Sequence, residues 1–332
     1  MLNFLKKVNS SLENRRSPAR TGGLMERSRL DLMFSRIMRL GLFVKPFARR
    51  VLTGGITPML AGYKITHRCN LQCVHCPYWK RSGSEQDFRG VRDTLARLRA
   101  TGAVILILEG GEPMLWRDGS FGIEDVIGEA HRHFPCVCMT TNGLIPFGHL
   151  DLSRVWVSLD GPEAIHDRIR GDGVYSRVMG NLSRVPGGRG FVSLTISSLN
   201  YDHAGALIRS LAGIAEGVTV QFYYPYNGLP DPMFVDIERR ARILDELVGL
   251  KLAGYPVANS AASLRELKRV SWTCYDELLV NADPDGTIEL GCYLKNRGPS
   301  ECSRCGFTAH NEMSLAFRGN LESIVAGLRI FF

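Results

Sequence analysis

The sequence predicts an α/β fold of six strand–helix units followed by a small cysteine-rich β-hairpin module. Strands alternate with amphipathic helices, polar and glycine-rich segments follow the strand ends, and the patterning changes to period two in the last third of the chain. Such alternation is typical of βαβ units with right-handed crossovers. The 332 residues suffice for one large α/β domain and a smaller module.

The elements of the large domain follow one another at regular spacing. They are expected, in chain order, as a strand ending at residues 63–66, a helix over 88–99, a strand over 104–108, a helix over 123–133, and strands over 136–141, 155–159, 192–197 and 218–223. The strand at 104–108 is continuously apolar, as a parallel strand buried on both faces should be. A further helix is expected over 236–254.

The nine cysteines are odd in number and grouped, which favours metal ligation in a reducing compartment over a secreted disulfide framework. No apolar run reaches the roughly 18 residues of a spanning helix, and no signal peptide opens the chain. The expected location is therefore the cytoplasm.

The net charge of +8 is concentrated at the N-terminus. Residues 1–52 hold twelve Lys or Arg against three acids, a net of +9, so the remaining chain carries −1. The body of the protein is therefore not basic, and no nucleic-acid partner is expected. Residues 1–24 have the polar, basic composition of a disordered segment.

Residues 29–52 carry an apolar stripe at helical spacing, with most basic side chains off the stripe and a kink expected at Pro46. A helix of this kind can lie in a membrane interface, each basic group near anionic lipid adding roughly 1 kcal/mol. This pattern predicts peripheral binding to the inner membrane face through residues 29–52. The alternative is an ordinary helix that covers the open end of the large domain.

The loop after the first strand carries Cys69, Cys73 and Cys76, spaced C-x3-C-x2-C. Iron–sulfur clusters usually take four thiolates, so three on one loop would leave one iron of a cubane cluster open. A structural zinc site would need a fourth ligand, and His75 would have to fold back on its own loop to supply it. Three unligated core cysteines are a weaker alternative, because free Cys rarely recurs at metal-ligand spacing.

Polar groups and glycines follow the later strands. The second strand ends in Glu109-Gly110-Gly111-Glu112-Pro113, the third in Thr140-Thr141-Asn142-Gly143, and the fourth carries Ser158 and Asp160 on one face. Two adjacent glycines let the chain pass close to a ligand. Carboxyl ends of parallel strands are where such folds place their chemistry.

These motifs, in this order, resemble those of the radical S-adenosylmethionine (radical SAM) superfamily, with His75 where an aromatic residue often stands. The resemblance covers about residues 60–305 and implies a partial (βα)6, TIM-like barrel. It further implies a 4Fe–4S cluster on the three cysteines, whose open iron chelates S-adenosylmethionine. One electron then yields methionine and a 5′-deoxyadenosyl radical, which abstracts hydrogen from an unactivated C–H bond inside a barrel that excludes solvent and oxygen.

The resemblance also implies roles for single residues. The segment Gly110–Pro113 holds the amino group of S-adenosylmethionine, Ser158 contacts the ribose, and Arg170 pairs with the methionine carboxylate, for which a guanidinium fork is suited. The other residues expected to face the cofactor are Thr141, Asn142, Asp160 and Asn200. A flavodoxin or ferredoxin is the expected electron donor, and His166 is interpreted as part of a solvated helix start.

The sixth strand ends in aromatic residues. Tyr223, Tyr224 and Tyr226, with Asp160, are the candidates for a substrate pocket in which a tyrosine hydroxyl donates hydrogen or a proton. A packing cap is an equal alternative. Cys136 and Cys138 share one face of the third strand and are interpreted as core packing.

A hairpin signal, Asp283-Pro284-Asp285-Gly286 between two period-two segments, marks the C-terminal module. Its cysteines, which predict a closed four-thiolate site for zinc or a fully ligated cluster, are Cys274, Cys292, Cys302 and Cys305. The pattern resembles the SPASM and twitch auxiliary-cluster extensions of radical SAM enzymes, and a 4Fe–4S cluster is favoured over zinc. The expected organisation is an extension over 1–56, a barrel over 57–255 and an auxiliary module over 256–332.

The substrate is the least determined feature. The basic amphipathic segment favours a membrane lipid or isoprenoid, whereas the SPASM-like module favours the alternative of a peptide- or protein-modifying maturase. A third alternative is a non-catalytic iron–sulfur protein that senses redox state.

Overall fold

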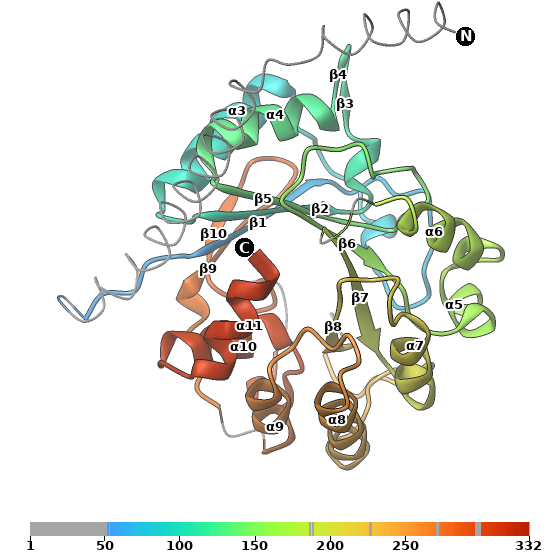
Figure 1. Cartoon of the computed structure of the whole chain (residues 1–332). Helices are drawn as coiled ribbons and strands as arrows, with labels where there is room; N and C mark the ends of the chain where they lie inside the picture. The colour runs from blue at the N-terminus through green and yellow to red at the C-terminus, as the bar shows by residue number, and fades with distance from the viewer. Residues whose placement is uncertain are drawn as a thin grey trace, which may run out of the picture. The chain divides into compact units, whose positions relative to one another are not determined.

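Figure 1 shows the computed structural model of the chain, which describes residue 52 and residues 54–331 apart from 186, 188, 226–227, 270–271 and 296–299. The described residues all fall within one unit, Pro46–Phe332. The membrane prediction for residues 29–52 lies, except for Leu52, outside this part of the chain. No helix in the described part is long and apolar enough to cross a bilayer.

The centre of the fold is an eight-stranded sheet with strand order β10-β9-β1-β2-β5-β6-β7-β8, in which every pair is parallel except β9 with β10. The strands are β1 (Leu60–Thr66), β2 (Ile105–Gly110), β5 (Cys136–Thr141), β6 (Arg154–Ser158), β7 (Gly190–Ile196), β8 (Gly217–Phe222), β9 (Leu279–Ala282) and β10 (Ile288–Leu290). The six strands predicted for the large domain are confirmed as β1, β2, β5, β6, β7 and β8. A separate ribbon pairs β3 (Arg117–Asp118) with β4 (Phe121–Gly122).

Helices follow the strands in the order that the sequence predicts. They are α3 (Phe88–Ala100), α4 (Ile123–His133), α5 (Glu163–Arg170), α6 (Val174–Leu182), α7 (Ala204–Ser210), α8 (Ile237–Leu252), α9 (Ala261–Arg269), α10 (Thr308–Phe317) and α11 (Leu321–Phe331). Caps fix two of the predicted starts: Asp87 accepts a hydrogen bond from Gly90 N before α3, and Asp236 accepts one from Arg239 N before α8. The predicted α/β class is confirmed.

The two faces of the sheet have different partners. On one face, alternate strand residues such as Leu106, Val137 and Val192 join the helices in a continuous apolar core. On the other face, α11 covers the amino ends of the strands: Phe331 lies 5.9 Å from the Trp156 ring of β6. Figure 1 shows α11 on this concave side of the sheet. The carboxyl-end half of the concave face is thereby left to polar side chains.

The predicted hairpin is confirmed as β9 and β10, with Gly286 in a left-handed turn at φ +84°. Its first strand pairs in parallel with β1, at the edge opposite β8. The hairpin therefore extends the main sheet, although the sequence assigns it to a separate module. Pairing with β9 satisfies the backbone N–H and C=O groups of β1, which would otherwise form an unpaired edge of the sheet.

Candidate active site

Three cysteine thiols lie together on the loop that follows β1. Cys73 is buried, and Cys69 and Cys76 are partly buried. Burial is the main reason that the pKa of the Cys73 thiol is raised to about 11; Arg170 acts to lower it, and the neighbouring thiols act to raise it. Among the residues that the structure describes, no three His, Cys, Asp or Glu side chains gather closely enough to hold a single metal ion.

Hydrogen-bond donors surround two of these sulfurs. Leu71 N lies 3.5 Å and Asn142 Nδ2 3.9 Å from Cys69 Sγ, and Arg170 Nη1 lies 3.8 Å from Cys73 Sγ. Donors aimed at sulfur stabilise a thiolate over a thiol. The donor set and its surroundings therefore fit an anionic, thiolate-ligated iron–sulfur cluster.

The glycine pair after β2 packs against the entry to the cysteine loop. A Cβ on Gly110 would collide with the carbonyl oxygen of Thr66, and a Cβ on Gly111 would collide with those of His67 and Arg68. Gly111 N donates to Thr66 O and Glu112 N to Arg68 O, both at 2.8 Å. In this structure the glycines allow close contact between two backbone segments, a reason that the sequence argument did not consider.

Glu112 joins the ends of β2 and β5. Its fully buried carboxylate accepts hydrogen bonds from Asn142 N (2.7 Å), the Thr141 hydroxyl (2.9 Å) and Met114 N (3.2 Å). Burial raises the pKa of Glu112, and these donors act against the rise. Glu112 also caps the short helix that begins at Pro113. Its expected contact with S-adenosylmethionine stays a prediction.

Asp160 and Arg170 form a buried ion pair with an Nε–Oδ2 distance of 2.6 Å. Burial alone would raise the pKa of Asp160, but the Arg170 and His75 side chains outweigh it and hold the pKa below its usual value. Arg170 thus links Asp160, just after β6, to Cys73 on the cluster loop. Its predicted partner, a methionine carboxylate, would have to share the guanidinium with Asp160.

Asn200 and His166 form hydrogen bonds with the backbone at the carboxyl ends of β6 and β7. Asn200 donates to Asp160 O at 2.7 Å and to Thr195 O at 2.9 Å, and it accepts from Ser197 N. His166 is fully buried and accepts from Asp160 N at 3.1 Å, which corrects its interpretation as a solvated residue. Ser158, at the end of β6, is partly exposed and faces Ser193 in register.

The aromatic candidates are largely buried. The Tyr223 hydroxyl donates to Asp231 Oδ2 at 3.2 Å, and the Tyr224 hydroxyl accepts from Glu301 N at 2.6 Å. The Tyr224 ring contacts Phe234 edge-on. Tyr226 lies outside the described residues. The contacts of the other two tyrosines match the packing-cap alternative, and a pocket role for them stays a prediction.

Sequence reasoning missed an ion pair on the concave face. Lys64 of β1 and Glu109 of β2 lie 2.5 Å apart, with side chains 7% and 32% exposed, and Lys64 Nζ lies 3.7 Å from the centre of the Tyr293 ring. Both residues occupy inward positions near the carboxyl ends of their strands. The sequence did carry a signal for this pair, because Lys64 and Glu109 are the charged residues of two otherwise largely apolar strands.

Cys305 lies within electrostatic range of each of the other three C-terminal cysteines. Burial, then Asp276, raises the pKa of Cys274 to about 12, with Cys305 and Cys292 contributing. Asp276 accepts from Cys292 N at 3.1 Å and pairs with Lys295 at 3.0 Å. His310 Nδ1 lies 4.0 Å from Cys274 Sγ. Four thiols are the donor set of an iron–sulfur cluster, although in the described structure they do not gather closely enough to hold a single metal ion.

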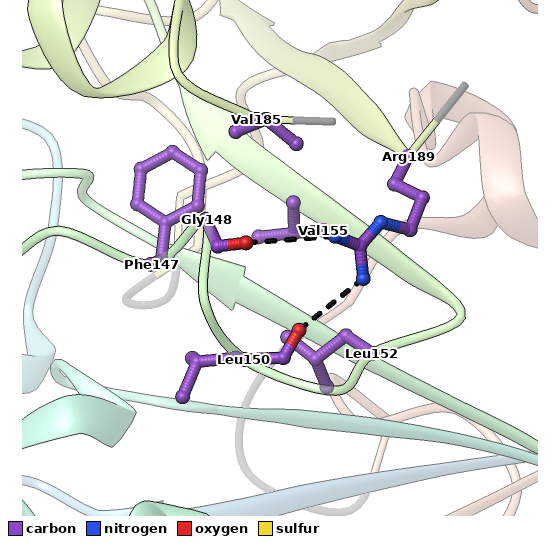
Figure 2. A pocket seen from close by; sticks show the side chains of 7 residues that line it. All are labelled: Phe147, Gly148, Leu150, Leu152, Val155, Val185 and Arg189. Atoms are coloured by element: carbon purple, nitrogen blue, oxygen red, sulfur yellow. Dashed lines mark hydrogen bonds between the residues drawn. The ribbon is translucent and has the colours of Figure 1, made fainter. Parts of the chain in front are cut away.

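A small hollow lies at the opposite end of the sheet (Figure 2). Its residues are Phe147, Gly148, Leu150, Leu152, Val155, Val185 and Arg189. Arg189 donates to Leu150 O at 3.3 Å and Gly148 O at 3.5 Å, as Figure 2 shows. Because it lies where β6 and β7 begin, we interpret it as part of the stabilising end of the fold. Cys136 and Cys138 are also buried, with sulfurs 3.6 Å apart, as core packing predicts.

A parallel, partly closed α/β sheet with a three-cysteine loop at its carboxyl end defines the class of the protein. Residues 63–187 match the family described as "Radical SAM superfamily". This part of the chain therefore carries a radical SAM domain.

Curated relatives match part of the chain. Mycofactocin maturase MftC of Mycolicibacterium smegmatis is 27% identical over 158 residues, 44% of this chain and 39% of that protein. Pre-heme d1 synthase of Dinoroseobacter shibae is 30% identical over 139 residues, 38% and 32% of the two chains. Sporulation killing factor maturation protein SkfB of Bacillus subtilis is 26% identical over 171 residues, 47% and 40%. The matches span less than half the length of these relatives.

Solved structures share the fold. Streptococcus suis SuiB bound to precursor peptide SuiA aligns with a TM-score of 0.60 and 12% identity, over 86% of this chain and 70% of that one. Native anSMEcpe with bound AdoMet and Kp18Cys peptide aligns with a TM-score of 0.56 and 15% identity, over 83% and 84%. These likenesses confirm the predicted partial-barrel fold.

Proposed function

We propose that this chain cleaves S-adenosylmethionine reductively and modifies a peptide substrate by radical chemistry. The observation that carries the proposal is the convergence of three segments on the cysteine loop: Glu112 after β2 contacts Arg68, Asn142 after β5 contacts Cys69, and Arg170 at the end of α5 contacts Cys73. Two of the relatives above are named maturation proteins, and one similar structure contains a precursor peptide. These names favour the peptide alternative over the lipid or isoprenoid substrate.

The chain's own residues would prepare the site in three ways. Cys69, Cys73 and Cys76 would hold a 4Fe–4S cluster, which when bound supplies the electron that splits S-adenosylmethionine into methionine and a 5′-deoxyadenosyl radical. Glu112 fixes the loop beside the cluster through Asn142. Asp160 orients the Arg170 guanidinium, because its carboxylate engages Nε.

The test of the activity is the formation of 5′-deoxyadenosine. The anaerobically reconstituted chain with S-adenosylmethionine and dithionite should produce it, and a Cys76→Ala variant should not. A wild-type protein that holds its cluster yet forms no 5′-deoxyadenosine would favour the redox-sensor alternative. A reduced flavodoxin or ferredoxin should replace dithionite as electron donor.

The test of the substrate class compares small peptides from cells that express the wild-type chain with those from cells that express Cys76→Ala. A mass change in one peptide, present only with the wild-type chain, is the expected result. The lipid alternative makes a different prediction: the full chain should float with vesicles that contain anionic lipid and not with neutral ones, through residues 29–52.

We also propose an auxiliary 4Fe–4S cluster on Cys274, Cys292, Cys302 and Cys305. Its support is that Cys305 lies within electrostatic range of each of the other three thiols and that thiolates are soft ligands. Iron near eight per chain is expected; iron near four with one zinc would instead support a zinc site.

A further inference from the structure

Arg240 of α8 is a buried cation with no carboxylate within ion-pair distance in the described part of the chain. The residue is 3% exposed. Its Nε donates to Val235 O at 2.8 Å and its Nη1 to Arg304 O at 2.9 Å. Its Nη2 is buried and has no hydrogen-bond partner among the described residues.

Such an arrangement is costly unless an anion compensates it. Burying an unpaired charge destabilises the folded state strongly, and hydrogen bonds to carbonyl oxygens offset only part of this cost. The guanidinium also lies over the Phe222 ring at 4.8 Å and the Phe234 ring at 4.4 Å. Cation–π contacts of this kind offset a further part of the cost. An anion close to Arg240 would account for the remainder.

The groups around Arg240 point to where this anion lies. Arg240 Nη1 donates a hydrogen bond to the carbonyl oxygen of Arg304, and a Cβ added to Gly306 would lie 3.0 Å from the same nitrogen. The guanidinium therefore touches the backbone on both sides of Cys305. Among the neighbouring charged groups, Cys305 has the strongest electrostatic effect on Arg240, ahead of Asp236.

We propose that Arg240 is a positioning residue of the auxiliary centre, where it offsets the negative charge of thiolate-bound metal and holds the turn at residues 304–306. This inference rests on the auxiliary centre proposed above. Adding an electron to a cluster adds negative charge, so a fixed cation beside Cys305 should raise the reduction potential of the cluster. The cation should also slow metal loss, because it stabilises the thiolate form.

Three variants of the full chain test the proposal. Arg240→Gln removes the charge, Arg240→Lys keeps it, and Arg239→Gln makes the same change of net charge at an exposed position on the same helix. Each protein is purified anaerobically and loaded with iron and sulfide. The measurements are iron and zinc per chain, metal release to a chelator, and EPR-monitored redox titration.

Arg240→Gln should lower the reduction potential of the auxiliary cluster and lose its metal at least tenfold faster than the wild-type chain. Arg239→Gln should remain close to wild type, and Arg240→Lys should retain the wild-type reduction potential. If Arg240→Gln does not fold, Arg240→Lys decides the question, because a purely geometric role would be lost with the guanidinium fork.

Thermal unfolding provides a second measurement that a structural brace alone would not reproduce. With metal bound, Arg240→Gln should be less stable than wild type; after chelation it should be more stable, since a buried uncompensated charge is gone. A loss of stability that is equal in both states would overturn the inference. Wild-type protein without metal at the four cysteines would overturn the auxiliary centre itself, which separates the two failures.

Discussion

At the scale of single residues, Gly111 shows how little room separates the two segments that build the site. Its Cα faces the carbonyl oxygens of His67 and Arg68, directly before Cys69. Any side chain there must move the cysteine loop away from the end of β2.

Gly111→Ala is accordingly expected to destabilise the chain by about 1–3 kcal/mol and to lower the iron bound at the cysteine loop. Urea unfolding and iron analysis check this result. Gly180→Ala is the control, because a Cβ there meets nothing within 4 Å inside α6; it should gain about 0.5–1 kcal/mol. Equal iron content in both variants would contradict the prediction.

His166 should make stability depend on pH. Burial, then Arg170, lowers its pKa to about 4, so the folded state excludes a proton that the unfolded chain binds near pH 6.5. The resulting stabilisation of the folded state is fully present above pH 6.5 and is lost as the pH falls towards 4. Through His166, the free energy of unfolding should fall by about 2 kcal/mol from pH 7 to pH 5.

The test compares urea unfolding at these two pH values in three proteins. His166→Asn retains an acceptor for Asp160 N and should show a smaller pH dependence than wild type. His149→Asn, at an exposed ion pair, should behave as wild type. The same slope in all three proteins would rule out the contribution of His166.

At the scale of elements, the hairpin turn is held both by its own conformation and by α3. Gly286 has φ +84°, and a Cβ would collide with the Gln86 amide. That amide accepts hydrogen bonds from the Tyr63 hydroxyl and from Thr94 at 2.8 and 2.9 Å. The hairpin tip therefore packs on the start of α3.

Gly286→Ala should cost about 1–2 kcal/mol for the left-handed backbone and roughly 1 kcal/mol more for the displaced hydrogen bonds. Gly213→Ala isolates the first contribution, because Gly213 has φ +76° and open space around it. Chemical denaturation measures the difference. Equal losses would mean that Gln86 adjusts without cost.

The elements themselves were largely predictable, because helix and strand follow from local periodicity. The helix at 123–133 and the strand at 136–141 agree to the residue with α4 and β5. The roles of side chains were less predictable: Asn200 and His166 bond to the backbone near Asp160, a neighbour that no local pattern reveals. The division into an extension, a barrel and a module stays a prediction.

At the scale of the whole molecule, the last helix returns to the concave face of the sheet. Phe331 contacts Trp156, and its carbonyl lies 4.0 Å from Cys136 Sγ. This helix closes the amino end of the sheet, so the polar carboxyl end is the one left for chemistry.

Phe331→Ala should cost about 1–2 kcal/mol, less than a fully buried Phe, and should shift the fluorescence of the buried Trp156 to longer wavelength. Leu321→Ala, at the exposed start of the same helix, should change neither property. Unchanged emission in Phe331→Ala would show that Trp156 is covered without this contact.

The α/β alternation, the cysteine spacings and the order of the motifs could be read from the chain alone, because they depend on residues near one another in it. The tertiary structure decided what each group touches. It placed β9 beside β1, paired Arg170 with Asp160, and brought Arg240 to the carbonyl of Arg304, 64 positions away. Such contacts depend on how strands and helices pack, and packing between distant segments leaves no local pattern in the sequence.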